Sequence, residues 1–449
     1  MLGDMTKGSV WKCISVFMFP ILIGNLLQQL YNTADSIIVG NFASQAFSLA
    51  AVGTCAPAAM LFVFWSTGFS GGGSVVIAQY FGAGKTDEIK RSISTLLLFT
   101  LISGLIMTAV GILISRWFLR VVLIVTGEIL PMATAYLRIY CVGLVFTFLY
   151  NGIAAVLRAL GNSRSSLLFL SVSAISNIFL DLLFVIVFDW GVAGAAFATV
   201  IAQTLCSIVS YVYLVKKYGD WLPKGREWVM DRAILRLIVK MGLPAALQSV
   251  AVQISSILLQ RMVNSFGPVN MEAFQCGTRM DNILLAPANA FGLAVTTFAA
   301  QNIGAGNLER AKKGMTVTAV LSLAVSLPLI ILITAFAPQL ARLFGVSEEG
   351  VVLAVKQIRW VVPGMVIFAT EIPGNGWIRG AGAARVAALC TLVTMLVRVI
   401  CAYLFVGTMG APAYWTFLPV GWAVSFFIVW GYYFSGKWKD KAIVSKARA

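Results

Sequence analysis

Five polar side chains recur at helical spacing in a predominantly apolar stretch near the N-terminus. They are Asn25, Gln28, Asn32, Asp35 and Ser36. The spacing places all five on one face of a helix, and Asp35 is the only charged residue between positions 19 and 41. A charge at the centre of a bilayer costs about 2.5–3.5 kcal/mol. The pattern therefore predicts that this face lines a bundle interior or a water-filled cavity. The alternative is a hydrogen-bonded seam between helices, for which Asn and Gln alone would suffice.

A second polar group lies further along the chain. Asn177 and Asp181 are four residues apart and so share a helix face. Thr199 follows in the next apolar stretch, where Gly191 and Gly194 allow another helix to approach closely. If these segments meet the first one, two carboxylates, an amide oxygen and a hydroxyl converge. Such oxygens suit a small cation such as Na⁺, or a proton held between two carboxylates. Separate local hydrogen bonds are the alternative.

The composition defines the class of protein that must position these residues. Of 449 residues, 59% are hydrophobic and only 11% are charged, and the mean hydropathy is +0.90. Soluble domains contain about 25% charged residues, so the chain is predicted to be a polytopic membrane protein. Apolar stretches long enough to cross a bilayer recur throughout. We expect twelve spans, at residues 14–40, 50–78, 93–115, 133–156, 166–188, 192–215, 237–264, 277–300, 315–336, 357–378, 386–406 and 415–435.

The basic residues indicate the orientation in the membrane. With the N-terminus in the cytoplasm, most of the 33 lysines and arginines fall in cytoplasmic segments, as the positive-inside rule requires. This distribution explains the net charge of +16 without a nucleic-acid partner. The sequence has no histidine, which excludes His-ligated metal sites and His-based catalytic triads. The seven cysteines form no CxxC pattern and are typical of small packing residues.

An internal repeat divides the chain. Residues 78–92 (AQYFGAGKTDEIKRS) resemble residues 300–314 (AQNIGAGNLERAKKG), and Gly143 recurs as Gly364 at an offset of 221. The repeat predicts an all-α polytopic membrane protein, with twelve transmembrane helices in two parallel six-helix lobes. A pseudo-two-fold axis along the membrane normal would relate the lobes, because an even number of spans gives both halves the same orientation. The predicted regions are an N-terminal lobe at 1–220, a cytoplasmic linker at 221–236 and a C-terminal lobe at 237–449.

The second half lacks a counterpart of the first polar group. Asp35 aligns with Leu259 and Asn177 with Arg398. Glu371 is predicted to lie deep in its span, where it could line a substrate cavity or pair with Arg398. Whether Asp281, near an outer helix end, contributes to binding is left open. The candidates for cavity-lining residues in both halves are Asn25, Gln28, Asn32, Gln253, Ser256, Gln260 and Glu371.

Pro20 lies in the first span, before the polar face. A proline removes one backbone hydrogen bond and kinks a helix. Pro20 is therefore either a hinge that moves when the charge of Asp35 changes, or a static kink.

These features together resemble the multidrug and toxic compound extrusion (MATE) family. The resemblance is carried by residues 29–40 (QLYNTADSIIVG), by the AQxxGAG sequence in each half, and by residues 157–164 (LRALGNSR). It covers nearly the whole chain and is nearer to the prokaryotic DinF-like branch. The NorM-like branch uses a carboxylate in helix 7, where this chain has Gln253. Glu371 falls near an acidic position used by that branch, so a secondary role for it stays open.

The resemblance implies a site and an activity. The cation site of the DinF-like branch falls on Asp35, Asn177, Asp181 and Thr199, and its bending proline falls on Pro20. The implied activity is export of organic, often cationic or amphipathic, compounds in exchange for H⁺ or Na⁺. We expect a monomeric, multi-pass protein of the prokaryotic inner membrane, with both termini cytoplasmic. Its partners would be drug-like molecules and lipid, with no cofactor beyond the coupling ion and no enzymatic activity. The alternative function is a lipid-linked precursor flippase of the same superfamily.

Overall fold

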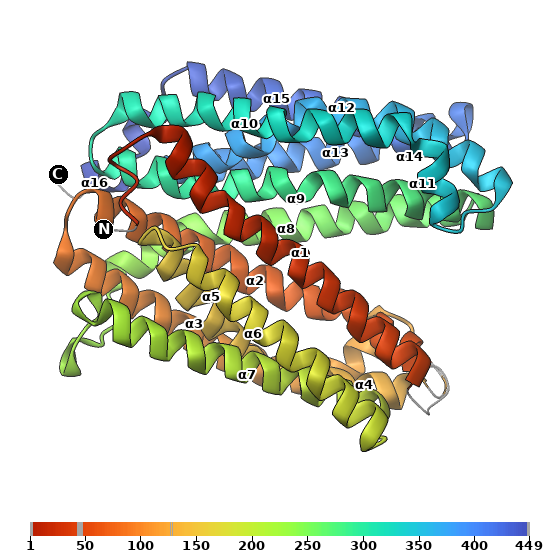
Figure 1. The fold of residues 1–449 in the computed structure, drawn as a ribbon, viewed down its shortest axis with the longest axis horizontal. Coiled ribbons are helices and arrows are strands. Elements are labelled where there is room, and N and C mark those ends of the chain that lie inside the picture. Colours follow the sequence, from red (N-terminus) through yellow and green to blue (C-terminus); the bar gives the residue numbers. More distant parts are fainter. Residues whose placement is uncertain (1–2, 43–47, 126, 128, 447–449) are drawn as a thin grey trace. The chain divides into compact units, whose positions relative to one another are not determined.

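The computed structural model describes residues 3–42, 48–125, 127 and 129–446. Every regular element in these ranges is helical (Figure 1). The α-helices of the first half are α1 Val10–Phe42, α2 Ser48–Gly82, α3 Thr86–Trp117, α4 Ile129–Val142, α5 Leu144–Ala159, α6 Arg164–Asp181 and α7 Gly191–Tyr218. Those of the second half are α8 Arg232–Asn264, α9 Pro268–Gly304, α10 Leu308–Ala335, α11 Ala337–Leu343, α12 Glu348–Gly380, α13 Ala384–Met409, α14 Ala413–Thr416, α15 Leu418–Phe434 and α16 Ile443–Lys446. The π-helical segments η1 Phe118–Val122 and η2 Leu182–Val187 extend α3 and α6.

Most of the helices are long and apolar enough to cross a bilayer. In the described residues, eleven candidate spans are found, or twelve if the bent pair α4 and α5 counts as one. A helix is favoured because lipid offers no partner for backbone N–H and C=O groups, which a helix satisfies internally. The all-α polytopic membrane fold predicted from the sequence is confirmed.

The repeated glycine makes the same kind of contact in both halves. Gly143 separates α4 from α5, which are bent by 43° to each other. A Cβ atom at Gly143 would come within 2.9 Å of the Val200 side chain on α7. A Cβ atom at Gly364 on α12 would come within 2.8 Å of Pro419 on α15. The offset of 221 thus repeats a close helix contact, and the predicted span at 133–156 is bent where the first of these contacts lies.

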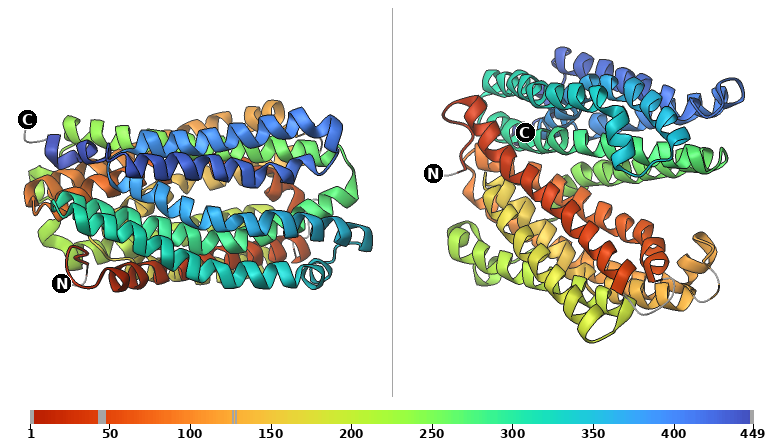
Figure 2. Two further views of the ribbon diagram at one scale, coloured as in Figure 1. Left: turned by 90° about the horizontal axis from the view of Figure 1, so that it is seen from above. Right: turned by 45° about the vertical axis from the view of Figure 1, so that its right-hand side comes forward.

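The chain forms two compact units. Unit 1 consists of residues 1–3 and 19–246, and unit 2 of residues 4–18 and 247–449. Within each unit the long helices lie side by side as a bundle (Figure 2). The division cuts α1 between Met18 and Phe19, one residue before Pro20, and it cuts α8 two residues after Pro244. The first part of each half's leading helix therefore belongs to the other half's unit.

The first part of α8 is packed tightly into unit 1. A Cβ atom at Gly72 of α2 would lie 2.5 Å from the backbone nitrogen of Gly242, and one at Gly68 would lie 2.7 Å from Ala246. The two backbones can approach this closely only because these α2 positions have no side chain. Just before α8, the backbone N–H of Asp231 donates to Thr95 Oγ1 on α3 at 3.0 Å.

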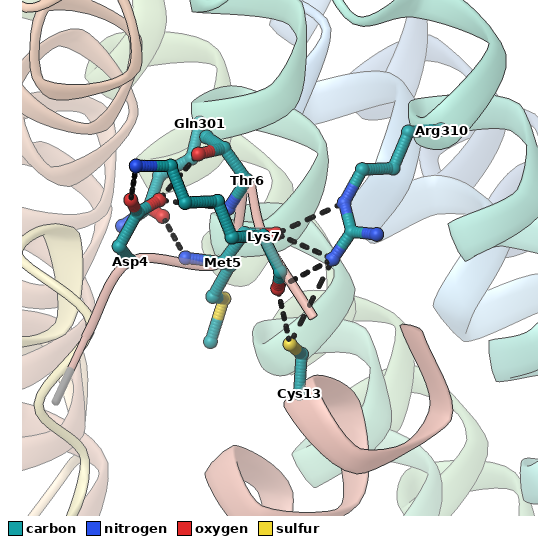
Figure 3. Close-up of polar contacts among 7 residues, drawn as sticks. All are labelled: Asp4, Met5, Thr6, Lys7, Cys13, Gln301 and Arg310. Carbon is teal, nitrogen blue, oxygen red and sulfur yellow. Dashed lines mark hydrogen bonds and ion pairs between the residues drawn. The ribbon is translucent and has the colours of Figure 1, made fainter. Parts of the chain in front are cut away.

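The segment before α1 is held in unit 2 (Figure 3). The buried Met5 donates its backbone N–H to Gln301 Oε1 at 2.9 Å. The Arg310 guanidinium donates to the backbone carbonyls of Met5 at 3.1 Å and of Lys7 and Gly8 at 2.8 Å each. Gln301 belongs to the second AQxxGAG sequence, so this motif fixes the beginning of the chain.

Asp4 supports the same segment electrostatically. Burial favours the neutral acid, but hydrogen bonds from Thr6 and the charges of Lys7 and Arg310 outweigh this effect and lower the pKa of the Asp4 carboxyl. Because the pKa of Asp4 is lower in the folded state, its carboxylate stabilises the fold at pH values above the unfolded-state pKa. This stabilisation is lost as the pH falls through the folded-state pKa. Acid therefore weakens the attachment of residues 4–9.

Replacing Arg310 tests this attachment. Arg310→Ala removes the guanidinium that donates hydrogen bonds to three backbone carbonyls, and a charged hydrogen bond is worth about 1.5–3 kcal/mol. We expect the midpoint of thermal unfolding in detergent to fall by several degrees, since roughly 2–4 °C corresponds to 1 kcal/mol for domains of this size. Amide exchange at residues 4–9 should accelerate.

The control is Lys313→Ala, which removes an exposed positive charge one turn further along α10. It should change neither measurement. If both variants behave alike, the hydrogen bonds of Arg310 do not hold the segment.

Candidate functional site

Asp181 occupies the position where a helix changes type. It is the last residue of α6 and is followed by the six-residue π-helical segment η2. Its side chain is 0% exposed. π-Helical turns inside helices are found frequently at functional sites. The local backbone thus directs a carboxylate into the interior of unit 1.

Three helices of unit 1 converge at one depth. Ile38 and Val39 of α1, Val185 of η2 and Ala195 of α7 form one buried apolar cluster. Asp35, Asp181 and Thr199 each lie one helical turn from a member of this cluster. One turn advances a helix by about 5.4 Å, so the three polar residues lie at a similar level.

Close approach of α7 depends on Gly194. A Cβ atom at this position would come within 3.0 Å of the Phe184 carbonyl oxygen on η2. The sequence predicted this role for Gly194. Gly191 begins α7 with a φ of 54°, a backbone conformation that glycine adopts without strain.

The polar atoms of the site are incompletely paired. Asn177 Nδ2 donates to Thr199 Oγ1 at 3.4 Å, and Thr199 Oγ1 donates to the Ala195 carbonyl at 3.0 Å. Among the residues that the structure describes, no hydrogen-bond donor is found for four buried oxygens: Asp35 Oδ1, Asn177 Oδ1 and both carboxylate oxygens of Asp181. Most buried polar atoms in proteins are paired. This cluster is therefore a set of acceptors for which the described residues supply no positive partner.

The two carboxylates act on each other. Asp35 and Asp181 lie close enough for a direct electrostatic interaction. Two unit negative charges about 4 Å apart repel by about 4 kcal/mol at an effective dielectric of about 20. A proton or a cation between them removes this cost. The arrangement can therefore bind and release one positive charge.

Two tyrosines near the carboxylates were not predicted from the sequence. Tyr31 on α1 and Tyr136 on α4 both experience the charges of Asp35 and Asp181. Tyr31 precedes Asp35 by one turn, so helical spacing could have identified it. Tyr136 comes from a helix with no polar periodicity, and no sequence signal links it to the site. Its phenol is buried and stacks on Tyr140 at a centroid distance of 6.4 Å.

The remaining first-half candidates lie along α1. Asn25 is partly buried and Gln28 is exposed, whereas the side chain of Asn32 lies outside the described part of the structure. Pro20 is buried within a helix that continues through it.

The second-half candidates are arranged around a cavity in unit 2. It has a volume of about 550 Å³ and is lined by Ser256, Gln260 and Glu371, but not by Gln253. Glu371 is 6% exposed and accepts a hydrogen bond from Ser425 Oγ. In the described residues no ion pair joins it to Arg398, which was the alternative considered from the sequence.

The donor set of unit 1 does not resemble a transition-metal centre. Within the described ranges, no group of three or more His, Cys, Asp or Glu side chains is placed to hold a metal ion. Two carboxylates, an amide oxygen and a hydroxyl are hard oxygen donors. Such donors suit a proton or an alkali cation.

Comparisons with known proteins agree with this architecture. The family model described as MatE matches residues 20–183 and 244–404. The chain is 30% identical over 443 residues to the probable multidrug resistance protein YpnP of Bacillus subtilis, covering 97% of both chains. It is also 26% identical over 337 residues to an FAD transporter of Shewanella oneidensis, covering 74% of this chain and 73% of the relative.

Solved structures share the fold. One is described as the outward-facing conformation of a multidrug resistance MATE family transporter of the MOP superfamily. It superposes with a TM-score of 0.90 at 24% identity, covering 98% of this chain and 99% of the other. This similarity concerns the arrangement of the helices.

Neutralising Asp181 should stabilise the protein. Asp181→Asn keeps the shape of the side chain and removes one of two repelling charges. In sodium-free detergent solution we expect a gain on the order of 1–3 kcal/mol. The gain should be larger in alkaline than in acidic buffer, because protonation relieves the repulsion in the parent protein. Thermal unfolding at several pH values measures it.

Asp189→Asn is the matched control. It removes the same charge at an exposed residue just beyond η2, and its φ of 54° is one that Asn tolerates. It should leave the stability unchanged at every pH. An Asp181→Asn protein that is less stable than its parent throughout the pH range argues against electrostatic repulsion in the site.

Proposed function

Since this chain belongs to the MatE family of multidrug transporters, we propose that it exports drug-like organic compounds, often cationic or amphipathic, in exchange for H⁺ or Na⁺ by alternating access. The observation that supports coupling is the cluster of four unpaired buried oxygens in unit 1. Such a cluster is costly when empty and favourable when a cation or proton occupies it.

Each residue has a distinct role in this proposal. Asp35 and Asp181 supply the negative charge that attracts the ion. Asn177 and Thr199 complete the oxygen donors and fix their orientation, since they are hydrogen-bonded to each other. A bound ion replaces repulsion between the carboxylates by attraction, which draws α1 and α6 together.

Pro20 transmits this change along α1. It lies 15 residues before Asp35, about 22 Å along the helix axis. Because proline has no N–H, the Val16 carbonyl lacks its helical donor, and bending at this point costs less than elsewhere. The division between the units in α1 falls one residue before Pro20. Loading of the ion site would thus change the angle between the two parts of α1.

This mechanism does not restrict the exported compound to drugs. One relative is named an FAD transporter, which makes a flavin dinucleotide a second candidate cargo. Transport of FAD from loaded vesicles, compared with a cationic dye, distinguishes the two.

The proposed location is the prokaryotic inner membrane, with a monomer whose termini are both cytoplasmic. The clustering of Lys and Arg in loops on one side supports this orientation. Green fluorescent protein fused to the C-terminus is expected to fluoresce, and alkaline phosphatase fused at the same place is expected to be inactive. A non-fluorescent first fusion together with an active second fusion contradicts the orientation.

Asp35→Asn tests the coupling. The variant retains shape and hydrogen-bonding capacity but cannot supply the charge that holds the ion. We expect gradient-driven export to fall roughly 10–100-fold, the equivalent of a lost charged interaction of about 1.5–3 kcal/mol. The measurement is dye efflux from proteoliposomes with Na⁺ and pH gradients imposed separately. Full export by Asp35→Asn under either gradient would falsify the proposal.

Two threonines of α7 provide a matched pair. Thr199 and Thr204 each donate to a carbonyl of their own helix, Ala195 and Val200 respectively, but only Thr199 contacts Asn177. Thr199→Ala should weaken the apparent affinity for the coupling ion roughly 2–10-fold. Thr204→Ala should not change it. Equal effects of the two substitutions would indicate a general effect on α7 instead of a ligand role.

A further inference from the structure

The cavity of unit 2 is lined by polar and charged residues together with large flexible or aromatic side chains. Its volume of about 550 Å³ is in the range of sites for drug-sized molecules. Phe368 and Trp422 face each other with ring centroids 5.0 Å apart, and both line it. Met365 and Met395 complete this wall. Aromatic and methionine surfaces of this kind bind flat organic molecules of varied shape.

Two carboxylates and two guanidiniums line this cavity: Asp281, Glu371, Arg379 and Arg398. Asp281 comes from α9 and Arg398 from α13. These two are near enough for their charges to interact, yet no ion pair between them is found among the residues that the structure describes. Neither the Asp281 carboxylate nor the terminal nitrogens of Arg398 have a hydrogen-bond partner in the same ranges.

Arg398 is held in place by a neighbour that leaves its terminal nitrogens available. Its Nε donates to Ser255 Oγ on α8 at 2.9 Å. This contact fixes the plane of the guanidinium while the Nη atoms remain available. A guanidinium presented in this way binds carboxylate or phosphate oxygens through two parallel hydrogen bonds.

The lining of the cavity also includes an acceptor for which the described residues supply no donor. Asn375 is 4% exposed and lines the cavity. Its Nδ2 donates to the Ala387 carbonyl at 3.0 Å, whereas Oδ1 is buried with no partner. A ligand N–H or O–H group would satisfy it, since a buried unpaired acceptor is costly.

The repeat sharpens the contrast between the two units. Arg398 is the counterpart of Asn177, and Leu259, which also lines the cavity, is the counterpart of Asp35. Where unit 1 presents two carboxylates, the cavity of unit 2 presents guanidiniums together with carboxylates, among them Arg398 and Asp281. A small inorganic cation gains nothing from such a pair of opposite charges, but a molecule that carries both signs does.

We propose that the cavity of unit 2 is a cargo site for amphipathic zwitterions. The anionic group of the ligand binds Arg398, its cationic group binds Asp281, and its aromatic body packs on Phe368 and Trp422. The inference rests on the proposed function in taking the bound molecule to be cargo. Ion and cargo then occupy separate units and do not compete for the same carboxylates.

The test is equilibrium binding to the purified protein in detergent, with protein-free micelles as the blank. The two probes are rhodamine B, a zwitterion, and its ethyl ester, a cation with the same fluorophore. Fluorescence anisotropy should show that the parent protein binds rhodamine B about tenfold or more tightly than the ester. Arg398→Gln should abolish this preference, and Arg398→Lys should restore part of it.

Two further variants separate recognition from folding. Asp281→Asn should weaken the binding of both dyes equally, because both carry the same cationic xanthene. The preference for rhodamine B over its ester should remain. Arg385→Gln removes an exposed positive charge near the beginning of the same helix and should change nothing. If Arg398→Gln unfolds, the equal weakening of both dyes by Asp281→Asn, with no change in Arg385→Gln, and the partial preference of Arg398→Lys still decide the matter.

Equal binding of the two dyes by the parent protein overturns the inference. Retention of the preference by Arg398→Gln does so as well. The assay needs no gradient, so it is independent of coupling. Selective binding without coupled efflux would count against the proposed antiport alone, and coupled efflux without selective binding would count against this site alone.

Discussion

A charge inside a lipid bilayer must be enclosed by protein, and this requirement organises the molecule. Asp181 is completely buried, and Asp35 has a buried oxygen with no partner. Both are shielded because α1, η2 and α7 pack through small or β-branched residues around the cluster of Ile38, Val39, Val185 and Ala195. Hydrocarbon could not solvate the carboxylates, so the packing that encloses them also sets their mutual repulsion.

The two halves use one scaffold for two kinds of chemistry. Gly143 and Gly364 make equivalent close contacts with the last long helix of each half, and α1 and α8 both divide beside a proline. These shared features concern backbone approach. The side chains that project into the interior differ, with carboxylates in one unit and charged residues of both signs in the other. Duplication preserved the helix contacts and allowed the interiors to diverge.

Much of the fold followed from local sequence properties. Runs of apolar residues gave the spans, and helical spacing placed Asn177 beside Asp181, because both properties depend on neighbours within a few turns. Tyr136 was missed because its proximity to Asp35 arises from packing between distant segments. The apolar lining of the unit 2 cavity was missed because Phe368 and Trp422 cannot be told from lipid-facing residues in a sequence. The passage of α1 and α8 from one unit to the other also depends on tertiary contacts alone.

That passage has a consequence for synthesis. Met5 is synthesised 296 residues before Gln301, the residue that accepts its backbone hydrogen bond. At about 5–20 residues per second, this interval is on the order of 15–60 s. During it the Met5 amide lacks the acceptor that it has in the folded protein. The attachment of Met5 can therefore form only after the segments of unit 2 that contain Gln301 and Arg310 have been synthesised.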